Sequence, residues 1–101
     1  METLTKETIL AYLRTLKPEL KKNGIEKIGL FGSYAKGCAD IASDIDIVIR
    51  TTPRFAEMQH DIEAFLYLER LRRQLMQAFH KKVDISDEAG LKQPMKETIY
   101  A

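Results

Sequence analysis

Apolar side chains recur along this chain at two different spacings, which indicate helices in some stretches and strands in others. From Thr5 to Leu16 they stand three and four positions apart, at Ile9, Leu10, Leu13 and Leu16. This spacing predicts an amphipathic helix with Thr5 as its N-cap. Pro18 suits the first turn of a further short helix, which Asn23 and Gly24 can end in a left-handed cap.

Three shorter stretches follow the period of a strand. They are Ile25 to Phe31, Asp44 to Ile49, and Lys82 to Ile85. Because successive side chains of a strand point to opposite faces, Asp44 and Asp46 share one face of the second stretch and its three isoleucines share the other. In the third stretch Val83 and Ile85 face the core, and Asp84 faces the opposite way.

A long helix is expected between the second and third strands, beginning near Arg54 after the break at Thr51-Thr52-Pro53. Its apolar stripe consists of Met58, Ile62, Phe65, Leu66, Leu68, Leu71, Leu75 and Phe79. Such a stripe is typical of core packing against a sheet. Near the C-terminus, Pro94 can start a final packed turn with Met95, Ile99 and Tyr100 as docking residues. These elements predict an α/β fold, a small mixed sheet with helices on one side and the aspartates at the opposite edge.

Composition narrows the classes of protein that this chain can represent. Its 101 residues suit a single domain, residues 1–101, without room for a second substrate-binding domain. Sixteen basic and fifteen acidic residues give a net charge of +1, which makes nucleic acid an improbable direct ligand. A lone Cys38 excludes an internal disulfide framework, and no stretch matches a membrane span or a signal peptide. We therefore expect a cytoplasmic protein.

The candidate chemistry lies in Gly32-Ser33 and in Asp44-Ile45-Asp46, which follow each other closely along the chain. Two carboxylates on one face of a strand repel each other unless a cation joins them. Magnesium fits, since it takes oxygen ligands from one or two carboxylates and from the phosphates of a substrate. Gly32 lets the backbone approach a phosphate, and Ser33 can begin a short helix whose N–H groups favour an anion.

Together these motifs resemble the minimal nucleotidyltransferases of the DNA polymerase beta superfamily. The resemblance rests on Phe31-Gly32-Ser33, Ala35-Lys36-Gly37, Ser43-Asp44-Ile45-Asp46 and Val83-Asp84-Ile85, and it covers nearly the whole chain. It implies that Gly32, Ser33 and Lys36 hold the triphosphate of ATP, and that Asp44, Asp46 and Asp84 bind Mg²⁺ and act in catalysis. Lys36 stands where many family members have arginine, so its phosphate contact lacks the planar bidentate geometry of a guanidinium.

The resemblance also implies a function and a partner. Small bacterial members of the family are commonly antitoxins paired with HEPN-domain ribonucleases, and they transfer AMP from ATP to a tyrosine of the toxin. Two alternatives stay open. The chain could neutralise such a toxin by binding alone, or it could modify a small molecule, as larger relatives in the superfamily do.

Several residues keep a structural reading beside the functional one. Asp84 could be a solvent-facing strand aspartate, and Ser43 could either orient Asp44 or cap a turn. The basic residues from Arg70 to Lys82 suit a solvated helix face, or contact with a nucleotide or an acidic partner surface. His60 and His80 lack the spacing of a metal site.

Overall fold

The computed structural model describes residues 4–40, 42–58, 62–88 and 98–101. In chain order the elements are helix α1 (Lys6–Lys22), strand β1 (Ile25–Phe31), helix α2 (Ser33–Lys36), strand β2 (Ile45–Thr51), helix α3 (Pro53–Met58), helix α4 (Ile62–Phe79), strand β3 (Val83–Asp87) and strand β4 (Ile99–Tyr100). Among the described residues, no helix is both long and apolar enough to span a membrane.

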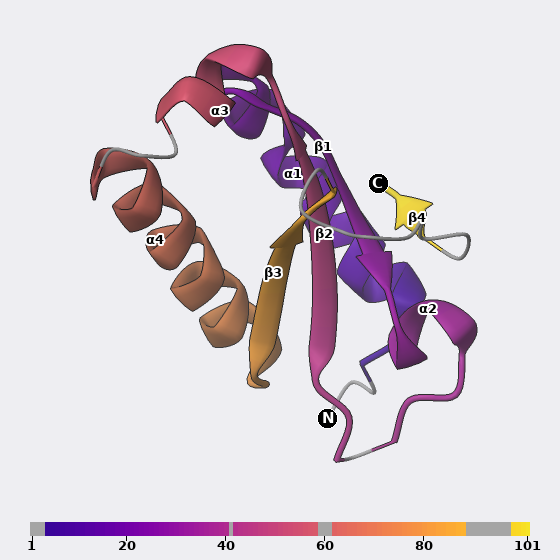
Figure 1. Ribbon diagram of the computed structural model, residues 1–101. Helices are drawn as coiled ribbons and strands as arrows, with labels where there is room; N and C mark the ends of the chain where they lie inside the picture. Colours follow the sequence, from indigo (N-terminus) through magenta and orange to yellow (C-terminus); the bar gives the residue numbers. More distant parts are fainter. Residues whose placement is uncertain (1–3, 41, 59–61, 89–97) are drawn as a thin grey trace.

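The strands form one mixed sheet in the order β3-β2-β1-β4. Strand β2 is antiparallel to β1 and parallel to β3, and β4 pairs antiparallel with the other edge of β1. The end of β1 and the starts of β2 and β3 consequently lie at the same end of the sheet, with α2 beside them (Figure 1). The predicted α/β class with a small mixed sheet is confirmed.

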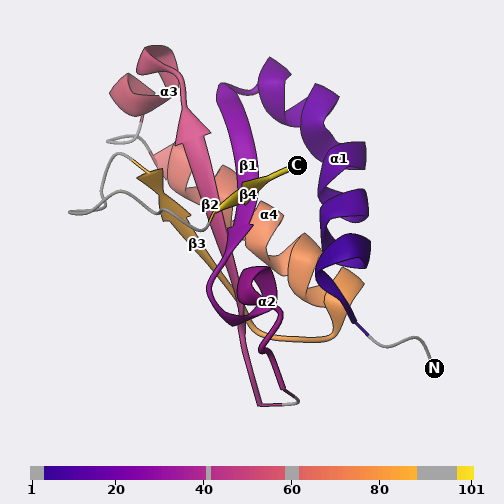
Figure 2. The same cartoon turned by 90° about the vertical axis from the view of Figure 1, so that its right-hand side faces the viewer.

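Helices α1 and α4 cover one face of the sheet, and among the described residues no helix lies over the other, which is called the uncovered face below (Figure 2). The core lies under these two helices. Ile45, Ile47 and Ile49 of β2 are at most 1% exposed, and they meet Leu13 of α1 and Leu75 of α4 in one apolar cluster. Asp46 lies between these isoleucines in the sequence and therefore projects from the uncovered face.

The first helix differs from the prediction because it runs without interruption through Pro18. Proline removes one hydrogen bond from a helix interior and disfavours helix in the preceding residue. Burial of Leu20 continues the apolar stripe past this point and holds the last turn on the sheet. The predicted ends are present: Thr5 forms a capping box with Thr8, and Gly24, at φ +89°, follows the C-cap residue Asn23.

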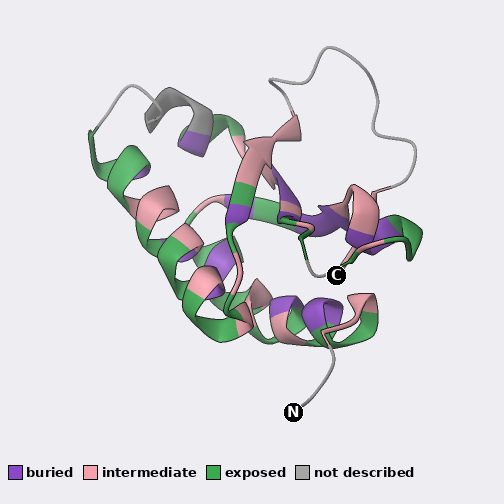
Figure 3. Cartoon of the chain, turned by 90° about the horizontal axis from the view of Figure 1, so that it is seen from below, coloured by how far each residue is buried: buried purple, intermediate pink, exposed green. Residues whose placement is uncertain are grey.

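The single long helix predicted from Arg54 is instead described as two helices, α3 and α4. Its apolar stripe is only partly packed. Leu71 and Leu75 are buried, but Ile62, Phe65 and Leu66 are 72%, 62% and 49% exposed. The outer side of α4 is mostly exposed (Figure 3). The prediction of core packing is therefore wrong for the first turns of α4, because helical periodicity reports an apolar face and not what covers it.

The end of the chain also differs from the prediction. Ile99 and Tyr100 form a strand that pairs with Leu30 and Gly29 of β1, where a final packed turn was expected. Gly29 permits this pairing, because a Cβ there would stand 2.9 Å from the carbonyl oxygen of Ile99. Pro94 and Met95 lie outside the described residues.

Candidate active site

The Gly32-Ser33 turn joins β1 to α2 through a backbone conformation that favours glycine. Gly32 has φ +76° and ψ −153°, a region almost closed to residues with a Cβ. Its carbonyl oxygen accepts the first helical hydrogen bond, from the N–H of Lys36 at 3.1 Å. Ser33 then begins α2 as predicted, and the first N–H groups of a helix lack intrahelical acceptors. This turn can therefore present backbone donors to a phosphate.

The three predicted aspartates lie at the end of the sheet next to this turn. Asp46 of β2 stands in register with Asp84 of β3, so the two occupy neighbouring positions on parallel strands about 4.8 Å apart. Asp44 comes directly before β2. Asp44 and Asp84 are exposed, whereas Asp46 is half-buried. The sheet register thus brings together residues that are 38 positions apart in the sequence.

Asp46 is also in close contact with Gly32. A Cβ built on Gly32 would overlap Oδ2 of Asp46. The missing side chain of Gly32 therefore leaves the space in which the carboxylate stands. A glycine at position 32 therefore meets two requirements: it permits the unusual backbone angles of the turn, and it leaves space for the carboxylate of Asp46.

The electrostatics of this end of the sheet favour a bound cation. Burial raises the pKa of the Asp46 carboxyl above its ordinary value of 3.8, and the negative charges of Asp84 and Asp44 raise that pKa further. A divalent cation would relieve this repulsion, and carboxylate oxygens are the type of ligand that such a cation prefers. Across residues 4–40, 42–58, 62–88 and 98–101, the acidic, histidine and cysteine side chains do not form a three-membered group arranged to hold a metal on its own. Two carboxylates together with nucleotide phosphates are, however, the usual way in which proteins bind Mg²⁺.

The connection between α2 and β2 is held by short hydrogen bonds around Asp40. The hydroxyl of Ser43 accepts from the N–H of Asp40 at 2.9 Å, and Oδ1 of Asp40 accepts from the N–H of Ala42 at 2.9 Å. Of the two readings of Ser43, the structure supports the turn cap.

Lys81 lies beside the same connection, although the sequence placed it only within a basic stretch. Its Nζ donates to the carbonyl oxygen of Ser43 at 2.8 Å and lies 5.8 Å from the centre of the Tyr34 ring. Its position directly before the predicted third strand, whose Asp84 was expected to bind the same Mg²⁺ as Asp44, could have indicated this contact.

The remaining residues considered in the sequence are Lys36, Cys38, His60 and His80. Lys36 is the last residue of α2 and is exposed. Cys38 is an exposed free thiol. His80 has φ +54° directly after α4, where its N–H donates to the carbonyl oxygen of Met76, so it terminates a helix. His60 lies outside the described residues.

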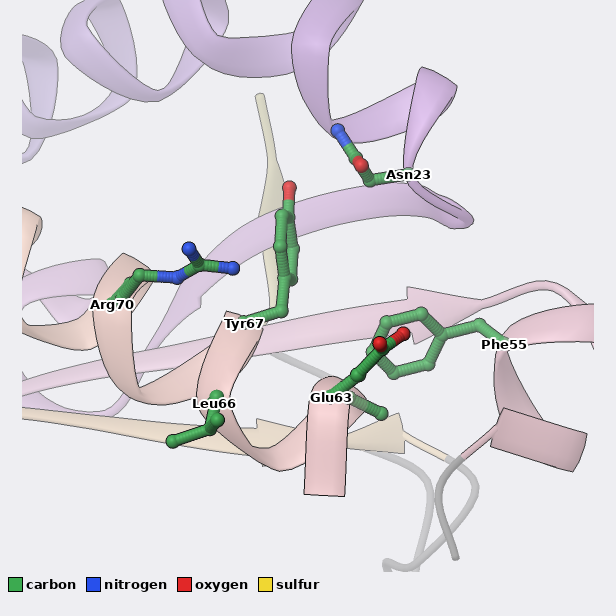
Figure 4. Close-up of a pocket in the computed structure, with 7 residues that line it drawn as sticks. Asn23, Phe55, Glu63, Leu66, Tyr67 and Arg70 are labelled. Carbon is green, nitrogen blue, oxygen red and sulfur yellow. The ribbon is translucent and has the colours of Figure 1, made fainter. Parts of the chain in front are cut away.

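A hollow of about 420 Å³ opens between α3, α4 and the end of α1, away from the three aspartates. In it the Tyr67 ring rises from α4 toward Asn23, with Arg70 beside it and Phe55 on the far side (Figure 4). Burial is the main cause that raises the pKa of the Tyr67 hydroxyl, and Glu19 raises it further. None of the predicted catalytic residues lines this hollow.

Comparison with known proteins places this geometry in a family. A model of the nucleotidyltransferase domain matches residues 13–100. The protein adenylyltransferase MntA of Thermococcus cleftensis is 32% identical over 105 residues, which cover 98% of this chain and 93% of that protein. A candidate protein adenylyltransferase of Methanocaldococcus jannaschii is 39% identical over 68% of this chain and 85% of its own length.

Solved structures agree. One described as a candidate minimal nucleotidyltransferase superposes with a TM-score of 0.71 at 25% identity, covering 98% of both chains. Another, from Sulfolobus solfataricus, shares the fold with a TM-score of 0.50 at 19% identity, over 94% of this chain and 80% of that one. The Gly32-Ser33 turn, the register of Asp46 with Asp84 and these matches lead to one conclusion: the chain belongs to the nucleotidyltransferase domain family and is a nucleotidyltransferase.

Proposed function

We propose that this chain transfers AMP from ATP, with Mg²⁺, to a tyrosine hydroxyl of a HEPN-domain ribonuclease and thereby acts as its antitoxin. The observation that carries the proposal is the position of Asp46, between the Gly32-Ser33 turn and Asp84. Anion-binding amides and metal-binding carboxylates stand side by side there, as transfer of a nucleotidyl group requires.

Each residue has a role in this reaction. Gly32 and Ser33 hold the triphosphate through backbone N–H groups, and Lys36 adds a positive charge at the end of α2. Asp44, Asp46 and Asp84 hold Mg²⁺, which supplies neutralisation of phosphate charge when it is bound. The acceptor oxygen bonds to the α-phosphorus while the bond from that phosphorus to pyrophosphate breaks. The hydroxyl proton passes to the carboxylate of Asp84.

A protein acceptor is supported by the relatives and by the surface of the chain. The first two relatives named above are described as a protein adenylyltransferase and a candidate protein adenylyltransferase. Asp46 and Asp84 project from the uncovered face of the sheet, and the side chains of Asp44 and Asp84 are exposed, so an acceptor hydroxyl can reach them from solvent. We infer that the acceptor enters from this face, because α1 and α4 close the other.

The test is transfer of label from α-labelled ATP to the HEPN-domain protein encoded beside this chain. We expect labelling with Mg²⁺, none with chelator, and loss of labelling in Asp44→Asn and Asp84→Asn. Glu26→Gln is the matched control, since it removes an exposed carboxylate from β1, outside the predicted site. Labelling that survives in both aspartate variants, or that is absent from the unmodified pair, would refute the proposal.

A second candidate, neutralisation by binding alone, is favoured by the exposed Ile62, Phe65 and Leu66 of α4. Large apolar side chains grouped on a surface are typical of contact with another protein. The two candidates separate in a double variant, Asp44→Asn with Asp46→Asn. Full neutralisation of the toxin by this variant supports binding, whereas lost neutralisation with retained association supports transfer of AMP.

A further inference from the structure

We propose that Lys81 is a positioning residue that holds the Gly32-Ser33 turn and the aspartate strand in one fixed relation. This inference rests on the proposed use of that site for ATP and Mg²⁺. Lys81 is half-buried, and its single ammonium group contacts two segments that are not its own. One is the connection that leads into β2, and the other is helix α2.

The first contact acts on the backbone directly before an aspartate. The ammonium donates to the carbonyl oxygen of Ser43 at 2.8 Å, and the next residue is Asp44. The N–H of Ile45 then donates to the carbonyl oxygen of Lys82 at 3.0 Å. The backbone on both sides of Asp44 is thus held by the two residues that precede β3.

The second contact acts on the turn. Tyr34 directly follows Ser33 in α2, is 7% exposed, and turns its ring toward the Lys81 ammonium at 5.8 Å. A cation over an aromatic face is attracted by the ring, and more strongly where water is partly excluded. Since the Tyr34 side chain is packed in the core, a force on its ring acts on the backbone of α2.

These contacts matter because the two halves of the site come from different segments. The Gly32-Ser33 turn ends β1, and the aspartates stand at the starts of β2 and β3. ATP bound with Mg²⁺ must contact both halves at once. The gain in ATP affinity that Mg²⁺ produces therefore depends on the distance between the turn and the aspartates. The hydrogen bonds of Asp40 close the connecting turn within itself, whereas Lys81 connects that segment to α2 and β3.

The test compares Lys81→Met with Lys82→Met. Both remove one positive charge and keep an unbranched side chain, but Lys82 is exposed and its part in these contacts is made by its backbone carbonyl. ATP affinity is measured by calorimetry, with chelator and with Mg²⁺, without any acceptor. Mg²⁺ should raise the ATP affinity of the unmodified chain, and we expect Lys81→Met to reduce this gain in affinity about 10-fold or more. Effects of this size are typical for groups that orient metal ligands. Lys82→Met should retain the gain, and Lys81→Arg should restore most of it.

A second measurement tests the link without nucleotide. Amide hydrogen exchange of Lys36 and Ile45 reports on α2 and on the start of β2, respectively. Lys81→Met should speed exchange at both positions together, and Lys82→Met at neither. Unchanged amide exchange in Lys81→Met would overturn the inference. So would an ATP affinity that Mg²⁺ raises as much in Lys81→Met as in the unmodified chain. If only the proposed function is wrong, Mg²⁺ will not raise the ATP affinity of the unmodified chain. Lys81→Met will then still exchange the amides of Lys36 and Ile45 faster than Lys82→Met does.

Discussion

Replacement of Gly32 by alanine is the sharpest test of how the turn and the aspartate strand depend on each other. The change adds one methyl group at a residue with φ +76° and ψ −153°. Two costs follow. The backbone enters a region that residues with a Cβ rarely adopt, and the methyl group overlaps Oδ2 of Asp46, which must then move.

Gly37 provides a matched control for the first cost. Its φ is +75° and its ψ is 18°, the ordinary left-handed conformation, and a Cβ there would meet nothing within 4 Å. An alanine in this conformation costs about 1 kcal/mol. At Gly32 the rarer angles cost about 2–3 kcal/mol. In a domain of this size we expect the Tm to fall by roughly 10–20 °C for Gly32→Ala and roughly 4–8 °C for Gly37→Ala.

The assay combines unfolding in urea with transfer of label from ATP at a temperature at which both variants are folded. Gly32→Ala should lose activity well beyond any unfolded fraction, because Asp46 no longer stands beside the turn. Gly37→Ala should keep its activity. The two costs at Gly32 also separate in a double variant with Asp46→Ala, which removes the overlapping oxygen and should recover part of the lost stability. Equal loss of activity in Gly32→Ala and Gly37→Ala would refute this reasoning.

Three further predictions concern stability; the first two are checked by urea unfolding and the third by amide hydrogen exchange. In chelator at pH 7, Asp46→Asn should be more stable than the unmodified chain, because burial and neighbouring charges raise the pKa of Asp46; this gain should vanish below pH 3.8, and a loss at pH 7 would contradict it. The pKa of Glu88 is lowered, mainly by its hydrogen bonds from Arg50 and then from the Tyr100 hydroxyl. Glu88→Gln should therefore cost stability above the ordinary pKa of 4.5, and the difference from the unmodified chain should shrink as the pH falls. Gly29→Ala should destabilise the pairing of β4, seen as faster amide exchange at Ala101, whose N–H donates to the carbonyl oxygen of Ile28.

The sequence predicted the fold well where one residue decides local structure. Gly24 at φ +89° ends α1 and lets β1 begin at once, and the strand with alternating isoleucines buries them as expected. A short helix was predicted to begin at Ser33, directly after a glycine that lets the backbone approach a phosphate, and Ser33 is the first residue of α2. Such signals are local, and a sequence displays them directly.

Features that depend on contacts between distant segments were not predictable in the same way. Pro18 indicated a helix boundary, but the burial of Leu20 against the sheet outweighed the missing hydrogen bond. Exposure of Phe65 could not be read from a stripe whose later members are buried. The overlap of a Gly32 Cβ with Asp46 and the contacts of Lys81 each join segments that come together only when the sheet forms.

Sheet topology explains why one small chain can gather these groups. Antiparallel pairing of β1 with β2 places the Gly32-Ser33 turn, which ends β1, beside Asp46 at the start of β2. Parallel pairing of β2 with β3 requires a crossover, and it is α4 that returns the chain to the same end, where Asp84 meets Asp46 in register. The crossover helix packs on one face, so the carboxylates must project from the other. A one-residue slip of β3 would turn Asp84 into the core and Val83 outward, so burial of Val83 fixes the register on which the third carboxylate depends.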